Sequence, residues 1–569
     1  MFREAETHFA QVPSIDIQRS KMKIQTDEKT SFNVGDIIPI FWKTVLPGDT
    51  VKMTYSAVVR MPSMLTPVMD NLDLDVSFYF VPYRLIFNRT KEMYGENTAG
   101  PWAPTTQYAF PTISAPSGGF AVGTIADHLH YPVGLNWSNT DKNAPNVLPI
   151  RAYAAICNYY WRDENLTYPL NIPVSDANQT GSNGSSYVND VANGGMPFKA
   201  SKHHDYFTSA LPTAQKAADP VTFPLLSGSK APVYPSTSHW GKAGDDVPSG
   251  MDDLYWLPSA SGKFTAAGAN NGDLKISPVN GEFQTRSYPD STGSSPYSVY
   301  PVNLVADLSS NVGAVTVNEL RLAFQLQRFY ERRAVAGSRM AETIKAFFGV
   351  TSPDSRLQNP EYLGGNRTPI TIHEVTNTSF DSGSSGAPLG NVAGKMNTSD
   401  INEVFEQSFT EGGILMGLAV VRASNRTYSQ GVPKELLVKT WEQMYWPPFS
   451  HLGEQPVKTV EIYADGFMDS DDVFGYQEAW SEYRYAPSTT SGLMRPGVSG
   501  SLASWHFGDY YTSAPTLSDG WIREPVSNVD RTLSVTSAVT NQLFGDFYFN
   551  MEWTRPMPVY SVPGLIDHF

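Results

Sequence analysis

Histidine and carboxylate groups are the residues of this 569-residue chain whose spacing could support chemistry. His128 and His130 stand two positions apart, so one strand could present both rings to a metal ion. No third ligand follows at a suitable spacing, and we interpret both histidines as surface or packing residues. Residues 469–472 (Asp-Ser-Asp-Asp) resemble the start of a calcium loop, but Val473 and Trp480 occupy its fifth and twelfth ligand positions. The acidic run therefore predicts a turn or a helix cap.

Nucleophilic and phosphate chemistry has no clear sequence motif either. His203, His204 and Asp205 lie together in a loop-rich stretch, which predicts a solvated cluster. The chain has neither a G-x-x-x-x-G-K-S/T phosphate loop nor a G-x-S-x-G nucleophile motif. Cys157 is the one cysteine, which excludes zinc sites built from several thiolates and favours a reducing compartment. We therefore expect no enzyme, no cofactor and no bound metal.

The composition favours a β-rich protein with long loops. Hydrophobic residues make up 41% and aromatic residues 12% of the chain, which is enough to order a core. The 44 glycines and 42 prolines are more chain-breaking residues than a helical bundle accommodates. The net charge of −15 excludes a free-standing nucleic-acid binder, so contact with phosphate must be local or aided by a basic partner.

Membrane insertion and export are not expected. The charged N-terminus lacks the apolar centre of a signal peptide. The longest apolar run, residues 414–421, is far shorter than the roughly 20 residues that span a bilayer. The sequence therefore predicts a protein that is made in the cytoplasm and stays out of the membrane.

Alternating hydrophobicity predicts strands at both ends of the chain. Residues 51–59 and 72–80 alternate apolar and polar side chains, and residues 547–553 do so near the C-terminus. Residues 414–421 are apolar throughout and predict a strand buried on both faces, and residues 460–462 predict a short strand. Little sheet is evident between the two ends.

We expect three regions along the chain. Residues 1–170 contain the first strands, residues 171–300 form a Gly/Pro-rich insertion, and residues 301–569 contain a long helix and the remaining strands. The insertion is too long for a structureless loop in a compact domain. Its scattered aromatic residues are too few for a core of their own, so neighbouring copies are expected to cover them. They include Trp240, Tyr255, Trp256 and Phe264.

A long helix is predicted after the insertion. Thr316 and Glu319 fit a capping box, and apolar residues then recur with helical spacing along one broad face. Arginines form a narrow stripe on the opposite face, and they are candidates for salt bridges to acidic groups of the same or a neighbouring subunit, for contact with DNA phosphate, or for solvation alone. They are Arg321, Arg328 and Arg332, joined by Arg339 if the helix continues through Gly337.

Several separated blocks resemble one protein family. The longest begins at Asn318 and reads NELRLAFQLQRFYERRAVAGSRMAETIKAFFGVTSPDSRLQNPEYLGG. It is followed in order by 444–455 (MYWPPFSHLGEQ), 473–485 (VFGYQEAWSEYRY) and 556–569 (PMPVYSVPGLIDHF). Together they resemble the major capsid protein of gokushoviruses, the Microviridae branch of small icosahedral phages with circular single-stranded DNA.

The resemblance implies a single eight-stranded viral jelly roll, all-β dominated, with very large inter-strand insertions and a few helices. It further implies a virion protein, with sixty copies forming a T=1 icosahedral shell around the genome. In such phages an insertion comparable to residues 171–300 forms protrusions at the threefold axes, which here would meet the host cell-surface receptor. The resemblance to the family is weakest in this stretch, which agrees with an exposed surface loop.

Charge implies a further partner for such a shell. Sixty copies at −15 each give about −900, which disfavours packing of DNA unless counterions or a small basic DNA-packaging protein intervene. The abundant aromatic residues leave one alternative open, a β-rich glycan-binding or glycan-cleaving protein. An enzyme of that kind needs two paired carboxylates, and the sequence singles out no such pair.

Overall fold

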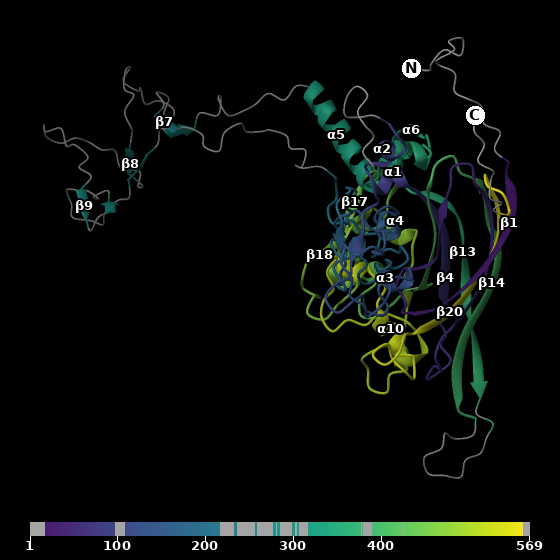
Figure 1. The fold of residues 1–569 in the computed structure, drawn as a ribbon. Coiled ribbons are helices and arrows are strands. Elements are labelled where there is room, and N and C mark those ends of the chain that lie inside the picture. Colours follow the sequence, from purple (N-terminus) through teal and green to yellow (C-terminus); the bar gives the residue numbers. More distant parts are fainter. Residues whose placement is uncertain are drawn as a thin grey trace, which may run out of the picture. The chain divides into compact units, whose positions relative to one another are not determined.

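Eight long antiparallel strands form the centre of the computed structural model of this chain (Figure 1). The structure describes residues 18–96, 108–216, 317–376, 378, 390–424 and 426–560, together with short strands between 217 and 316. It divides into two compact units, Met1–Lys216 with Glu331–Phe569, and Ala217–Tyr330. The eight strands are β1 (Ser20–Phe32), β2 (Ile38–Val45), β3 (Thr50–Arg60), β4 (Leu72–Pro82), β13 (Glu361–Thr376), β14 (Val392–Ser408), β15 (Gly413–Ala423) and β20 (Leu543–Arg555).

The strand order is that of a jelly roll. Neighbours in the sheet run β1-β20-β3-β14-β13-β4-β15-β2. Counted along the chain, one half contains strands one, eight, three and six, and the other half contains strands five, four, seven and two. The first and last strands are therefore neighbours, as in the double Greek key of a jelly roll. The prediction of an all-β-dominated, eight-stranded jelly roll is confirmed.

The core between the two halves of the sheet follows the predicted alternation. In β3, Met53 and Tyr55 are buried while the residues between them face out. In β20, Phe547, Phe549 and Trp553 are buried in the same way. These side chains belong to one hydrophobic cluster with residues of β1, β2, β4, β13, β14 and β15. The strands predicted at 51–59, 72–80, 414–421 and 547–553 are confirmed.

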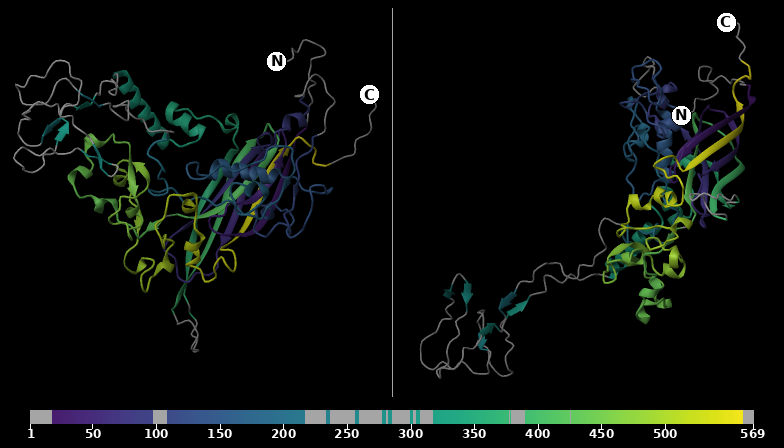
Figure 2. Two further views of the ribbon diagram at one scale, coloured as in Figure 1. Left: turned by 90° about the vertical axis from the view of Figure 1, so that its left-hand side faces the viewer. Right: turned by 90° about the horizontal axis from the view of Figure 1, so that it is seen from below.

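The two outer faces of the sheet differ. On the half made of β13, β4, β15 and β2, the outward side chains Val81, Met416 and Leu418 pack in a second cluster with α4 (Leu148–Ile156). Figures 1 and 2 show α4 on this side of the strands. The half made of β1, β20, β3 and β14 instead exposes polar side chains, such as those of the ion pair Lys52–Glu403 (2.8 Å). Burial on both faces explains why β15 is apolar throughout.

Two long insertions carry most other elements. One lies between β4 and β13 and the other between β15 and β20. The helices are α1 (Tyr83–Ile86), α2 (Thr90–Met93), α3 (Ile125–His128), α4, α5 (Val317–Val335), α6 (Met340–Phe348), α7 (Asp354–Leu357), α8 (Lys434–Leu437), α9 (Asp519–Ile522) and α10 (Val526–Asp530). The paired short strands are β5 (Ile113–Ser114) with β6 (Gln179–Thr180), β16 (Thr427–Tyr428) with β19 (Ser488–Thr489), and β17 (Glu454–Lys458) with β18 (Val473–Glu478).

The unit Ala217–Tyr330 contains three two-stranded pairs of its own. These are β7 (Val233–Pro235) with β12 (Leu304–Ala306), β8 (Trp256–Pro258) with β11 (Val299–Pro301), and β9 (Ser277–Val279) with β10 (Glu282–Gln284). The division of the chain at residues 170 and 300 stays a prediction.

Two local expectations need correction. Residues 460–462 do not form a strand, because the Glu461 carboxylate accepts a hydrogen bond from the Lys458 amide (2.8 Å) and caps a one-turn helix at Thr459–Glu461. The predicted long helix is confirmed as α5, but it ends at Val335. Gly337 follows with φ of 92°, a left-handed conformation in which glycine is favoured, so the chain turns before α6.

Replacing Phe549 tests the core directly. Its ring is 1% exposed and lies 5.0 Å from Phe41 and 6.3 Å from Phe78. Phe549→Ala should lower the free energy of unfolding of the chain by about 3–5 kcal/mol, because it leaves a cavity between the sheets. Tyr548→Ala, at the exposed neighbouring position of β20, should change it by less than about 1 kcal/mol. Equal losses in urea unfolding would contradict this packing.

Candidate assembly surface

His128 and His130 each contact a side chain of β1. His128 Nδ1 lies 3.2 Å from the Thr30 hydroxyl, and His130 Nε2 lies 3.3 Å from Glu28 Oε2. Burial lowers the pKa of His128, whereas the hydrogen bond with Glu28 raises the pKa of His130. Both contacts agree with the packing and surface interpretation. Within the described ranges, no group of three or more His, Cys, Asp or Glu side chains is placed to hold a metal ion.

Within the stretch predicted to be a solvated cluster, His204 is exposed, but His203 and Asp205 are partly buried. The Asp205 carboxylate accepts hydrogen bonds from the Tyr428 hydroxyl (2.6 Å) and from the Thr208 amide (2.8 Å). Burial and the nearby Arg422 charge lower the pKa of His203 to about 4. The sequence could not reveal this, because Tyr428 and Arg422 lie more than two hundred positions away. Of the acidic run at 469–472, only Asp469 lies in a turn; the rest leads into β18, and Asp471 pairs with Lys458 (2.6 Å).

The four candidate arginines do not form one stripe. Arg321 and Arg328 are exposed on α5. Arg332 donates to the Ala346 carbonyl (2.6 Å) and lies 5.3 Å above the Phe347 ring. Because the helix ends before Gly337, Arg339 lies instead at the start of α6, where it pairs with Glu342 (3.2 Å) and Glu164 (3.4 Å). Contact of any of these arginines with DNA or a neighbouring subunit stays a prediction.

The candidate aromatic residues of the insertion are at positions that carry no described side chain. Trp240, Tyr255 and Phe264 lie outside the described residues, and Trp256 is described only as part of the backbone of β8. Their role at a protruding surface stays a prediction.

A buried ionic cluster joins the two insertions, and sequence reasoning missed it. Asp509 is 3% exposed and lies 2.9 Å from Lys202 Nζ and 3.1 Å from an Arg426 nitrogen. Arg426 also pairs with Glu524, so two buried cations face two buried carboxylates. Burial alone would raise the pKa of Asp509, but the charges of Lys202 and Arg426 hold it well below its usual range. Since Lys202 comes from the first insertion and the other three members come from the second, the Lys202–Asp509 pair ties the two insertions together.

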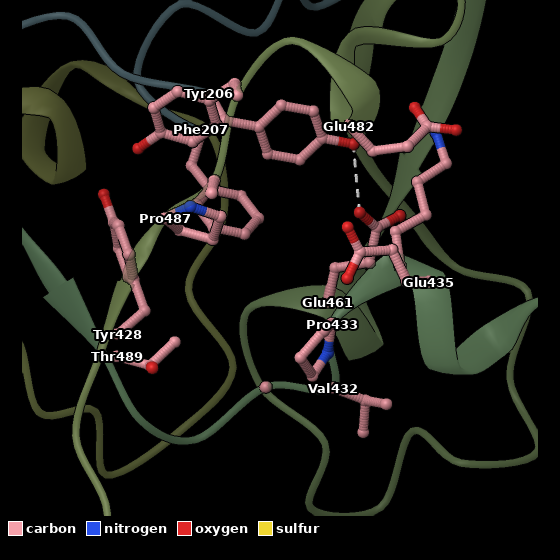
Figure 3. A pocket seen from close by; sticks show the side chains of 14 residues that line it. Tyr206, Phe207, Tyr428, Val432, Pro433, Glu435, Glu461, Glu482, Pro487 and Thr489 are labelled. Atoms are coloured by element: carbon pink, nitrogen blue, oxygen red, sulfur yellow. Dashed lines mark hydrogen bonds and ion pairs between the residues drawn. The ribbon is translucent and has the colours of Figure 1, made fainter.

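Beside this cluster lies a pocket of about 220 Å³ (Figure 3). Four aromatic rings line it, from Tyr206, Phe207, Tyr428 and Tyr485. Tyr206 and Tyr485 stack at 5.8 Å, and the Tyr206 hydroxyl donates to Glu461 Oε2 at 3.0 Å. The packing thus brings residues of both insertions into one cavity.

An exposed apolar segment extends from α8 to the start of β17. Trp441 is 64% exposed, and its ring meets that of Trp446 edge-on at 6.0 Å. These side chains contribute little to the core of one chain, although they are the kind most enriched in protein interfaces. We call this set the aromatic segment; it comprises Leu436, Trp441, Met444, Tyr445, Trp446 and Leu452.

An acidic pair follows the aromatic segment directly. Glu454 of β17 stands opposite Glu478 of β18 in the strand register. Neither of its carboxylate oxygens finds a hydrogen-bond donor in the part of the chain that the structure describes. Burial, together with the charges of Glu331 and Glu478, raises the pKa of Glu454 to about 7. This carboxyl therefore titrates close to neutral pH.

Jelly rolls with large insertions and exposed apolar surface are typical of viral shell subunits. A family model described as capsid protein (F protein) matches residues 10–565 of this chain. The Capsid protein VP1 of Spiroplasma virus 4 is 37% identical over 556 residues, which cover 96% of this chain and 96% of that protein. The Capsid protein VP1 of Bdellovibrio phage phiMH2K is 36% identical, covering 100% of this chain and 99% of that protein.

A third relative, Capsid protein VP1 of Chlamydia phage 1, is 34% identical and covers 98% of each chain. The chain therefore belongs to the capsid protein (F protein) family, the major capsid proteins of Microviridae phages. It is a virion protein that self-assembles. No helix in the described stretches has the length and apolar character needed to cross a membrane.

Replacing Glu454 should change how stability depends on pH. The pKa of this carboxyl is near 4.5 in the unfolded chain and about 7 in the fold, so folding favours the protonated form. Its contribution to stability is complete below about pH 4.5 and is lost as the pH rises through about 7. Glu454→Gln should therefore gain about 1–3 kcal/mol over the native chain at pH 8, and much less at pH 5.

Urea unfolding between pH 5 and pH 8 measures this difference. Asp471→Asn removes an exposed carboxylate next to β18 and should leave the pH slope above pH 6 unchanged. If the Glu454→Gln and native chains lose stability in parallel from pH 5 to pH 8, Glu454 is ionised throughout and the prediction is wrong.

Proposed function

We propose that sixty copies of this chain form a T=1 icosahedral shell that encloses a circular single-stranded DNA genome. The observation that carries the proposal is the aromatic segment, since apolar side chains that one copy leaves exposed can be buried by its neighbours. The exposed side chains Leu320 and Phe324 of α5 add a second apolar surface of the same kind. Closed symmetry allows each copy to offer these surfaces to several neighbours.

The proposed role is structural, with no catalytic activity. Synthesis in the cytoplasm of a bacterial host and assembly into the virion are part of this proposal, and membership of the capsid protein family supports them. Since the net charge of −15 per chain repels DNA phosphate, packing of the genome calls for counterions or a small basic DNA-packaging protein. Arg321 and Arg328 are the candidate contacts to DNA or to a neighbouring subunit, because both are exposed.

Trp441→Ala tests the role of the aromatic segment in assembly. Buried tryptophans contribute about 2 kcal/mol or more to the interfaces that they anchor, and every copy would lose the same contact. We expect a large drop in the yield of megadalton spherical particles, measured by size-exclusion chromatography and electron microscopy. The unassembled chain should keep its unfolding free energy, since Trp441 is 64% exposed.

Glu442→Ala is the matched control, because Glu442 is exposed on the same helical turn and presents little apolar area. It should leave particle yield unchanged. Normal particles from Trp441→Ala would contradict the proposed contact. A native chain that stays monomeric and binds glycans would contradict the shell itself and support the glycan-binding alternative.

We further propose that, within residues 171–300, the stretch after Lys216 forms the surface that meets the host-cell receptor, since Phe198, Lys202 and Phe207 before it are buried. The support is the Gly/Pro-rich composition of this stretch and its weak resemblance to the family, both typical of surface loops. Excising residues 228–286 should give shells that assemble but attach poorly to cells. Binding of purified particles to host cells measures attachment, and normal infection by the excised protein would overturn the proposal.

A further inference from the structure

The pocket of Figure 3 combines aromatic walls with unbalanced negative charge. Three carboxylates line it, from Glu435, Glu461 and Glu482, against one lysine, Lys434. Lys434 Nζ lies 3.4 Å from Glu482, and both side chains are largely buried. When these four side chains are ionised, the lining of this cavity of about 220 Å³ carries a formal charge of −2.

Glu461 is the carboxylate that the fold holds most firmly in this cavity. It is 6% exposed and accepts hydrogen bonds from the Tyr206 hydroxyl (3.0 Å) and the Lys458 amide (2.8 Å). Both donors are neutral, so among the described residues no cation is bonded to this buried carboxylate. Burial raises the pKa of Glu461, and these bonds together with the more distant Lys434 only partly oppose that rise.

The aromatic walls suit the stem and head of a cationic chain. Phe207 and Tyr428 meet edge-on at 4.8 Å, and the Tyr428 hydroxyl is turned to Asp205. Val432, Pro433 and Pro487 complete an apolar lining. Ring faces attract ammonium and guanidinium groups, most strongly where water is excluded, and an alkyl stem packs against proline and valine.

We propose that this pocket binds an alkylguanidinium or alkylammonium group through the aromatic rings and the Glu461 carboxylate. Such a group ends a basic side chain of a neighbouring copy, and it also ends a free polyamine. The two sources share one chemistry and differ in whether the assembled particle leaves the pocket open.

Binding of n-butylguanidinium to the unassembled chain tests the chemistry, with n-butylurea as the neutral probe of similar shape. Isothermal titration calorimetry should show saturable binding of the cation, with affinity for the urea lower by about tenfold or more. Glu461→Gln keeps one acceptor oxygen for the Lys458 amide, and its NH2 group can donate to the Tyr206 hydroxyl oxygen, so the variant should fold and weaken cation binding by a similar factor. Glu442→Gln, a change at an exposed carboxylate outside the pocket, should leave it unchanged.

Assembled particles then separate the two sources. Loss of the site on assembly identifies a basic side chain of a neighbouring copy, and retention of the site identifies a free polyamine. Absence of saturable binding to the unassembled chain, equal affinity for both probes, or equal affinity of native and Glu461→Gln chains would overturn the proposal. Since the measurement uses unassembled chains, these outcomes do not depend on whether the shell forms.

Discussion

The antiparallel pairing of β1 with β20 is the constraint on which the rest of the structure depends. Its register runs without a break from Ser20 opposite Arg555 to Phe32 opposite Leu543, so the two ends of the described chain form one ladder. The chain between β1 and β20 must therefore begin and end at neighbouring strands. Short connections suffice at most steps, and the two long insertions leave from β4 and β15, on the half of the sheet that they cover.

The half of the sheet made of β13, β4, β15 and β2 and the two insertions bury each other's apolar side chains. Some side chains of β4 and β15 point away from the cluster between the two halves of the sheet. They are apolar, and packing against α4 and the insertion residues around it removes them from water. The insertions in turn hold each other through Asp509, Lys202, Arg426 and Glu524, a cluster without net charge. Removing one member would leave a buried charge unpaired, so this cluster specifies how the insertions meet.

The apolar side chains that a single chain exposes indicate where capsid subunits of this family contact each other. The half made of β1, β20, β3 and β14 carries mostly polar side chains on its outer face. The aromatic segment instead exposes tryptophan and tyrosine side chains beside Glu454, whose pKa burial raises to about 7. An assembling subunit has to keep such surface soluble before it meets a neighbour. Charged and apolar groups placed side by side satisfy both requirements.

Local periodicity in the sequence was enough to predict the strands with regular alternation, the strand β15 with apolar side chains on both faces, and the helix α5. The separated family blocks were enough to predict the class of protein. The sequence did not reveal β13, where Gly364, Gly365 and Pro369 interrupt the pattern, or β14; pairing with neighbouring strands orders both. Nor could it place His203 and Asp205, the Asp509 cluster or the aromatic pocket. Their partners lie about eighty to three hundred positions apart, and only the tertiary fold brings them within hydrogen-bond distance.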